Sequence, residues 1–497
     1  MTPRSFSANV ALTLVASLAP ALAAAATLPL MYGLLGAERL GVLSLAWVAI
    51  GAFAFLDAGL GRALTHETSR LLALGRASEI RPVVHGALLL LGAIGIVGAL
   101  GIMTGVDALV ARLHAAGALA PEIRATLLVC AVAVPLMTVS AGIRGVLEAH
   151  GRFDVTSLAR VGLGAATYLG PWLTVRASNS LVWAVGSIVA ARFVATVLLY
   201  LVMESTLGAA PPGPPGPVWA RVRQTFTGGV WMTVTSVAGA LLTVVDRFIL
   251  GAMVSLAAIA YYSTPHELIG KLTLIPMALS AVLFPAMSAA AARESDDVVR
   301  LFTRGMRYTF VLLLPVAAIG AGLAREWLAL WLGLEFSQAS QHVVQWLCLS
   351  VLLQSLAVTP LNVLQAAGRA HVTAWLQLVQ LPVFVAGVWW AVSVAGINGA
   401  AFAWAARMLL DLTLLLGISW RSTPATAAAI RSWTVLIALT VAWFIAVVQL
   451  DSLAARAGML VIGLGAFAAH LPRLIGRDDL AQLRAMVTRR FGPQGAR

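Results

Sequence analysis

The chain has 497 residues, of which 60% are hydrophobic and only 11% are charged, and its mean hydropathy is +0.92. A soluble domain is about half apolar and about a quarter charged, so this composition excludes an ordinary soluble protein and indicates one that lies in a bilayer. The net charge of +13 is spread over many short loops, which argues against a nucleic-acid partner.

Fourteen apolar stretches follow one another along the chain, each close to the roughly 20 residues that a helix needs to cross a bilayer. The first follows Arg4 as the core of a secretory signal peptide would, but it is too long for such a core, so we expect it to be retained. The pattern predicts an all-α polytopic membrane protein, with spans at 9–35, 40–61, 83–106, 125–143, 157–175, 181–203, 226–250, 257–290, 308–331, 342–366, 372–394, 397–419, 433–450 and 457–472.

The third stretch carries a glycine at every third position. Small residues let neighbouring membrane helices approach closely, and a hinge for helix motion is the alternative role. We therefore expect tight helix packing at Gly92, Gly95, Gly98 and Gly101.

A segment of eleven residues occurs twice in the chain. VLEAHGRFDVT begins at Val146 and VLQAAGRAHVT begins at Val363, and seven of the eleven positions are identical. An internal repeat of this kind indicates two similar halves. The copies follow the fourth and the tenth spans, so an even number of spans separates them and both lie on the same face of the membrane. The halves are therefore predicted to have parallel topology, as in one class of transporters.

The proline-rich segment GAAPPGPPGP separates these halves, because proline at this density does not continue a helix. The predicted organisation is a six-helix lobe at 1–207, this linker at 208–217 and a second six-helix lobe at 218–420. Two additional helices at 421–472 lie outside the repeat, and a basic tail follows at 473–497.

The loop arginines predict the orientation of the chain. With a cytoplasmic N-terminus, most of the 33 Lys+Arg lie on the cytoplasmic side, where basic loop residues are enriched and contact anionic lipid headgroups. We therefore expect both termini in the cytoplasm. The opposite side receives only Arg39, Arg112, Arg124, Arg176 and Arg456.

The sequence lacks the motifs of the common enzyme classes. It contains no G-x-x-x-x-G-K-[ST] phosphate loop, no G-x-S-x-G turn and no His/Cys/Asp/Glu spacing typical of a metal site. Cys130 and Cys348 both stand in apolar spans, where packing is the expected role. We therefore expect a protein that is not an enzyme and that has no metal or cofactor.

Charged residues inside the spans are the remaining candidates for function, because each costs about 2.5–3.5 kcal/mol at the bilayer centre and needs a partner or a wet cavity. Arg192 and Arg407 stand near the middle of the sixth and twelfth spans, at matching places in the two halves. Together with Lys271 and Arg247, they are predicted to line a cavity and to contact an anionic ligand. The alternative for Arg192 is a structural salt bridge to another span, for example to Asp246.

Acidic residues accompany these cations at helical spacing. Asp411 stands one turn after Arg407, and Glu267 stands one turn before Lys271, which suits ion pairs between positions i and i+4. The candidates for such ion pairs, or for coupling to a driving cation, are Asp246, Glu267, Asp411 and Asp57.

Several segments resemble the bacterial polysaccharide-biosynthesis flippases of the multidrug/oligosaccharidyl-lipid/polysaccharide exporter superfamily. The resemblance begins with LPLMYGLLGAERLGVLSLAWVAIGAFAFLDAGLGRAL, from Leu28 to Leu64, and continues with VVDRFILGAMVSLAAIAYYSTPHELIGKLTLIPMALSAVLFPAMSA, from Val244 to Ala289. TPLNVLQAAGRAHVT and AGINGAAFAWAARMLLD match later helices. The resemblance covers most of the chain to about residue 420. It implies two six-helix lobes around a central cavity, and as cargo an oligosaccharide on a polyprenyl diphosphate.

The expected function is flipping of a lipid-linked O-antigen or related lipopolysaccharide glycan across the bacterial inner membrane, by alternating access of two lobes. The planar guanidinium of arginine suits a diphosphate. The expected partners are the lipid-linked oligosaccharide, anionic membrane lipids, and glycan polymerase or assembly proteins. The alternative is a cation-coupled multidrug or small-molecule antiporter of the same superfamily. That alternative is weakened because the first span lacks the buried acids that such antiporters commonly use. A membrane enzyme of glycan assembly is a third and weaker possibility.

Overall fold

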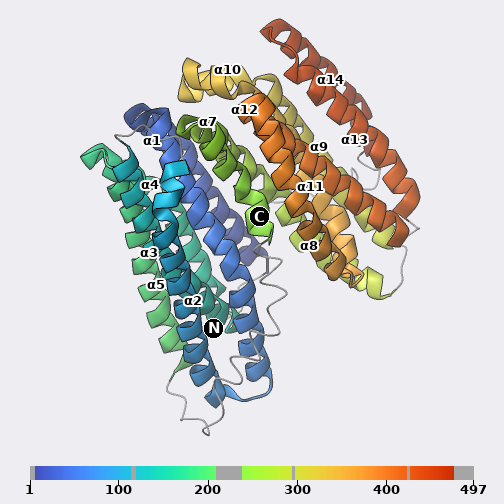
Figure 1. The fold of residues 1–497 in the computed structure, drawn as a ribbon. Helices are drawn as coiled ribbons and strands as arrows, with labels where there is room; N and C mark the ends of the chain where they lie inside the picture. The colour runs from blue at the N-terminus through green and yellow to red at the C-terminus, as the bar shows by residue number, and fades with distance from the viewer. Residues whose placement is uncertain (1–5, 113–118, 209–237, 294–296, 423–425, 475–497) are drawn as a thin grey trace, which may run out of the picture. The chain divides into compact units, whose positions relative to one another are not determined.

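The computed structural model describes residues 6–112, 119–208, 238–293, 297–422 and 426–474. The described elements are helices throughout (Figure 1), as the sequence predicts. Most of the predicted linker at 208–217 and nearly all of the predicted tail at 473–497 lie outside the described residues. A helical segment at 238–253 joins the named elements, which are α1 (Phe6–Ala73), α2 (Ala77–Arg112), α3 (Ala120–Ala149), α4 (Phe153–Ser178), α5 (Leu181–Leu207), α7 (Leu256–Gly270), the 3-10 helix η1 (Lys271–Thr273), α8 (Leu274–Ala292), α9 (Asp297–Gly322), α10 (Ala324–Leu332), α11 (Leu334–Ala366), α12 (Ala370–Ser422), α13 (Ala427–Val448) and α14 (Leu453–Leu474).

The two longest helices each contain two predicted spans. In α1, Gly36 leaves the helical conformation at φ 71° and ψ 177°, in the gap predicted between the first and second spans. In α12, Ala395 and Gly396 do so in the gap between the eleventh and twelfth spans. A positive φ is accessible to glycine because it has no Cβ. Ten of the described helical stretches are long and apolar enough to cross a membrane, which makes the chain a polytopic membrane protein.

The chain divides into two compact units, which are described separately. The first unit comprises Met1–Leu268 and Ala374–Ala403, and the second comprises Ile269–Thr373 and Trp404–Arg497. The six-helix lobes predicted from the repeat, at 1–207 and 218–420, stay a prediction.

In the first unit, α3 packs against α1, α2 and α5, and α4 packs against α1 and α5 (Figure 1). An apolar core joins four of these helices, with Leu64 of α1, Val84 of α2, Leu147 of α3 and Met203 of α5 fully buried. Burial of such side chains contributes about 1.5–3 kcal/mol each in water. In a bilayer the same contacts act mainly through close packing, because lipid tails are themselves apolar.

The glycine series of the third predicted span lies on α2, and part of it faces α3. A Cβ added to Gly95 would lie 2.5 Å from the Cα of Pro135, so the two helices approach too closely for any larger residue. A Cβ on Gly98 would lie 3.3 Å from Val134, whereas one on Gly101 would meet nothing within 4 Å. The predicted packing role is therefore confirmed at Gly95 and Gly98 and is wrong at Gly101.

In the second unit, α11 is the central helix. It packs against α8, α9, α10 and α13, and 83% of its most apolar window is buried. Two polar side chains inside this helix are satisfied locally or by a neighbour: Ser350 donates to the Trp346 carbonyl at 2.7 Å, and Asn362 donates to Ser280 of α8 at 2.7 Å. Such bonds remove the cost of burying a polar group in an apolar setting.

The eleven-residue repeat forms the same turn in both copies. Gly151 and Gly368 both have φ of 74°. The N–H of Arg152 donates to the Leu147 carbonyl at 2.9 Å, and the N–H of Arg369 donates to the Leu364 carbonyl at 2.9 Å. With the accompanying bonds from each glycine to the residue three positions earlier, these are Schellman caps, which end a helix at a left-handed glycine.

A third copy of this turn stands between α1 and α2. Gly75 has φ of 70°, its N–H donates to the Leu72 carbonyl at 3.1 Å, and the N–H of Arg76 donates to the Leu71 carbonyl at 3.0 Å. The shared pattern is Leu-x-Ala-x-Gly-Arg. It puts an arginine just beyond the carbonyl end of each helix, where a cation is favoured by the helix dipole.

The C-terminal end of the predicted span at 308–331 is wrong. The helix α9 stops at Gly322, and Leu323 has φ of −106° and ψ of 22° before α10 begins. The indole N–H of Trp327 folds back and donates to the Gly320 carbonyl at 3.0 Å. This bond satisfies a carbonyl near the end of α9. The predicted span is thus divided between two helices.

Candidate functional site

Four side chains meet in the interior of the first unit, and we call Asp246, Arg247, Tyr262 and His266 the polar cluster. Asp246 and Arg247 stand on the segment 238–253 and are 0% and 4% exposed. Tyr262 and His266 stand one turn apart on α7 and therefore share a face of that helix. The Tyr262 hydroxyl donates to Oδ2 of Asp246 at 2.5 Å, and the backbone N–H of Arg247 donates to Oδ1 at 2.9 Å.

The guanidinium of Arg247 is held on several sides. Its Nη1 donates to the Thr243 carbonyl and, at 3.3 Å, to Oδ1 of Asp246. Its Nη2 donates to Nδ1 of His266 at 2.8 Å. Because a guanidinium only donates hydrogen bonds, Nδ1 of His266 is the acceptor and carries no proton in this arrangement. The ring of Tyr262 lies 5.7 Å from the guanidinium carbon, within the range of a cation–π contact.

A second polar pair joins α4 to α7 in the same unit. The hydroxyl of Tyr168 donates to Oε2 of Glu267 at 3.0 Å, and the ring of Trp47 from α1 lies 5.2 Å from the Tyr168 ring at an interplanar angle of 58°. Tyr168 is 5% exposed and Trp47 is 7% exposed. Glu267 directly follows His266 in the chain, so the two polar groupings adjoin along α7.

Arg192 stands near the middle of α5, as predicted, and is half-buried. Ile188, one turn before it, is 1% exposed, and Thr196, one turn after it, donates its hydroxyl to the Arg192 carbonyl at 2.8 Å. The Thr196 side chain therefore turns back to its own helix. The predicted contact of Arg192 with an anionic ligand stays a prediction.

The other predicted cations belong to the second unit. Arg407 is half-buried on α12, and its guanidinium carbon lies 5.0 Å from the Trp404 ring, while Asp411 stands half-buried one turn on. Lys271 is half-buried and begins η1, the 3-10 helix that interrupts the predicted span 257–290. A 3-10 stretch in the middle of a helix often marks a hinge. Here it coincides with the only lysine of the chain.

The structure groups some of the predicted residues with residues that sequence reasoning did not select. It brings Asp246 and Arg247 to His266 and also to Tyr262, and it gives Glu267 the partner Tyr168. The spacing of Tyr262 and His266 was a usable signal, whereas nothing in the pattern around Tyr168 indicated a partner nearly a hundred positions away. The side chain of Asp57 lies outside the described residues.

The side chains just described have the chemistry of binding and charge compensation. Across the part of the chain that the structure describes, no three His, Cys, Asp or Glu side chains gather as a metal site needs. The polar cluster therefore consists of fixed donors and acceptors that position a cationic side chain inside an apolar bundle.

Comparison with known proteins places this fold among membrane transporters. Residues 6–291 match the family described as "Polysaccharide biosynthesis protein". The Shigella flexneri protein named "Putative O-antigen transporter" is 25% identical over 392 residues, which cover 77% of this chain and 90% of that protein. The matched family covers more than half of the chain.

Solved structures with similar folds come from two transporter groups. The "Lipid II flippase MurJ, inward closed conformation" has a TM-score of 0.67 at 11% identity, covering 94% of this chain and 98% of that chain. The "Inward-facing conformation of a multidrug resistance MATE family transporter of the MOP superfamily" has a TM-score of 0.65 at 14% identity, covering 83% and 99%. At these identities the likeness shows the fold alone.

Proposed function

Since the chain belongs to the polysaccharide biosynthesis protein family, we propose that it flips a polyprenyl-diphosphate-linked oligosaccharide, an O-antigen unit or a similar glycan, across the bacterial inner membrane. The observation that carries this proposal is the 25% identity to a protein named as an O-antigen transporter, maintained over 77% of the chain. The family match, the relative's name and the described spans support a multi-pass transporter, and the substrate is the step we add.

The cations inside the membrane helices support an anionic cargo. Arg192 and Arg407 are half-buried near the middle of apolar helices, and Lys271 is half-buried at η1. A cation at such depth faces the protein interior or a water-filled passage, because exposure to lipid is costly. A diphosphate carries the complementary charge, and guanidinium groups bind its oxygens in pairs.

Arg247 of the first unit is a further candidate cation, and it is held more rigidly. The polar cluster fixes its guanidinium against Asp246 and His266, so it supplies positive potential without large motion. Preorganised charge stabilises an anion without a reorganisation cost when the anion binds. In this scheme Asp246, Glu267 and Asp411 balance the cations or take up the driving cation, and alternating access of the two lobes moves the headgroup.

The test uses cells that lack this gene and that still assemble the lipid-linked glycan. We expect them to accumulate the glycan-lipid on the inner leaflet, and wild-type protein to restore the surface glycan. Arg192→Ala and Arg407→Ala are expected to lower this restoration about tenfold or more, the effect of losing one charge-assisted contact of about 1.5–3 kcal/mol. Arg192→Lys should retain part of it. Arg300→Ala is the matched control, because that side chain is 76% exposed.

Membrane abundance of each variant, measured by immunoblot, separates loss of transport from loss of protein. Full restoration by both alanine variants at normal abundance would contradict the proposal. Export of cationic drugs, with no change in the glycan-lipid pool, would instead favour the antiporter alternative.

A further inference from the structure

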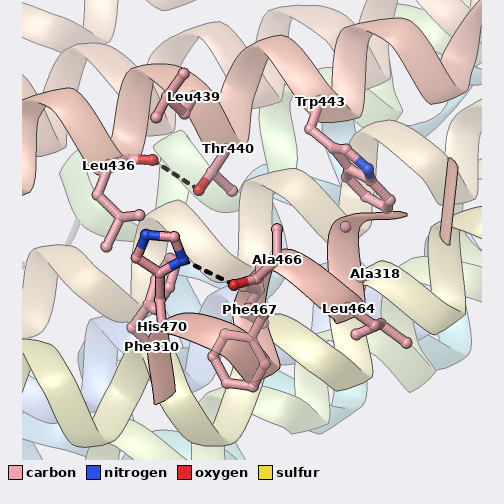
Figure 2. Close-up of a pocket in the computed structure, with 12 residues that line it drawn as sticks. Phe310, Ala318, Leu436, Leu439, Thr440, Trp443, Leu464, Ala466, Phe467 and His470 are labelled. Carbon is pink, nitrogen blue, oxygen red and sulfur yellow. Dashed lines mark hydrogen bonds between the residues drawn. The ribbon is translucent and has the colours of Figure 1, made fainter. Parts of the chain in front are cut away.

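A cavity of about 230 Å³ lies between α9, α13 and α14 in the second unit and is open along one side (Figure 2). Its lining is almost wholly apolar, with Phe310 and Leu314 from α9, Leu436 from α13, and Leu464 and Phe467 from α14. These helices include the two that lie outside the sequence repeat, so the cavity is a feature of the additional pair and its neighbour α9.

Two polar side chains on the cavity wall, Trp443 and Thr440, donate to nearby backbone carbonyls. The indole N–H of Trp443 donates to the Met459 carbonyl at 3.0 Å. The hydroxyl of Thr440 donates to the Leu436 carbonyl at 2.8 Å, as Figure 2 shows. An apolar cavity of about 150 Å³ stays dry and binds benzene. A larger space with the same character therefore suits a hydrocarbon rather than water.

The open side of the cavity faces the hydrocarbon of the bilayer. Leu439, which lines the cavity on α13, is 64% exposed, and only 6% of the apolar window of α14 is buried. In a membrane protein, an exposed apolar surface of a spanning helix is covered by lipid tails. The molecule that fills the cavity is therefore expected to come from the lipids of the bilayer.

One end of the cavity carries a side chain that can accept a hydrogen bond from a lipid headgroup. His470 lines the cavity, and its Nδ1–H donates to the Ala466 carbonyl at 2.9 Å, which leaves Nε2 as an acceptor for an outside donor (Figure 2). The predicted orientation puts this end of α14 at the cytoplasmic side of the membrane, at the level of the lipid headgroups.

We propose that this cavity holds one acyl chain of a bilayer phospholipid, whose headgroup lies beside His470. The lipid fills the space between α9 and the α13–α14 pair, while direct contact holds that pair together: a Cβ on Gly463 would lie 2.6 Å from Nε1 of Trp443. The site is separate from the transport residues described above, and it does not rest on the proposed substrate.

Native mass spectrometry of the purified full-length protein tests this. We expect the wild type to retain one phospholipid after detergent exchange. Ala466→Phe fills the rim of the cavity and should lower the lipid-bound fraction about tenfold. Val461→Phe adds the same ring to the same helix away from the cavity and should leave the lipid bound. No adduct on the wild type, equal retention by Ala466→Phe, or an adduct with the mass of an isoprenoid carrier would each overturn the proposal.

A measurement on the wild type alone guards against a variant that misfolds. A phospholipid with a diazirine on one acyl chain is incorporated into vesicles with the protein and activated by light. We expect crosslinks on the cavity faces of α9, α13 and α14, including Leu436 and Phe467. Labelling confined to other lipid-facing helices would overturn the proposal. A defect in glycan transport leaves both readouts unchanged, so the two proposals fail independently.

Discussion

Arg456 at the start of α14 and Glu326 of α10 form a two-pronged ion pair, with Nη2–Oε1 at 2.7 Å and Nη1–Oε2 at 3.1 Å. The same guanidinium donates to the Gly322 carbonyl at 3.2 Å, at the point where α9 ends. Arg456 is 2% exposed although its sequence position indicated a loop, whereas the Glu326 side chain is 31% exposed. The pair therefore fastens an additional helix to the second unit, and its two members differ in burial.

This difference in burial predicts which of the two alanine substitutions destabilises the protein more. Glu326→Ala leaves a buried guanidinium without its carboxylate, so we expect a loss of about 3 kcal/mol or more in the free energy of unfolding. Arg456→Ala leaves a partly exposed carboxylate, which water solvates, and should cost less. Melting temperatures of the purified variants in detergent check this. The control is Arg124→Ala, which breaks an exposed pair and should cost at most about 1 kcal/mol. A lower melting temperature for Arg456→Ala than for Glu326→Ala would contradict the argument.

Asp246 makes an analogous prediction inside the polar cluster. Asp246→Ala removes the carboxylate from a guanidinium that is 4% exposed, and we expect a loss of about 3–5 kcal/mol. Tyr262→Phe removes one hydrogen bond to the same carboxylate and keeps the ring over Arg247, so a loss of about 1 kcal/mol is expected. Thermal unfolding of the two variants side by side measures the difference. Equal melting temperatures would show that the carboxylate does not compensate Arg247.

Two glycines of α2 form a matched pair for testing helix approach. Gly95→Ala puts a Cβ against Pro135 and Thr138 at 2.5 Å, so the helices must separate, and we expect a loss of about 1–3 kcal/mol. Gly101→Ala meets nothing within 4 Å and should be neutral or stabilising by up to about 1 kcal/mol, because alanine is the better helix former. The melting temperature should therefore fall for Gly95→Ala and stay equal or rise for Gly101→Ala, and a destabilised Gly101→Ala would refute the packing account.

The repeated turn predicts equal effects at two distant sites. Gly151→Ala and Gly368→Ala put a Cβ into the same left-handed conformation, and each should cost about 1–2 kcal/mol. Asparagine tolerates this conformation better, so Gly151→Asn and Gly368→Asn are expected to lose less. Stability in detergent and abundance in the membrane are the readouts. A neutral alanine variant at either position would mean that the turn relaxes there.

Most of the fold was accessible from the pattern of apolar residues. Spans of the required length predicted the helices, and the breaks at Gly36 and at Ala395–Gly396 fall in the predicted gaps. The end of α9 was missed because Leu323 stands in a run that is apolar apart from Arg325 and Glu326. Hydropathy reports what a residue prefers as solvent and carries no information on a local change of φ and ψ.

The candidate site was accessible only in part. Charges within apolar spans identified Asp246, Arg247 and Glu267, since a charge in a membrane helix is costly enough to be noticed. Their partners Tyr262 and Tyr168 were not identified, because tyrosine is common in apolar helices and the Tyr168–Glu267 bond joins distant parts of the chain. Arg456 was assigned to a loop for the complementary reason, since sequence position alone does not reveal that a guanidinium is buried by a carboxylate from another helix.

The Leu-x-Ala-x-Gly-Arg turn has a mechanical consequence. Between Ala149 and Phe153 the chain has only three residues, and backbone hydrogen bonds bind all of them to the preceding helix or the next. Because this connection is short and fully hydrogen-bonded, it fixes the angle between α3 and α4. A rotation of one helix is therefore transmitted to the other. Any rearrangement during a transport cycle must bend one of the two helices or move both as one rigid body.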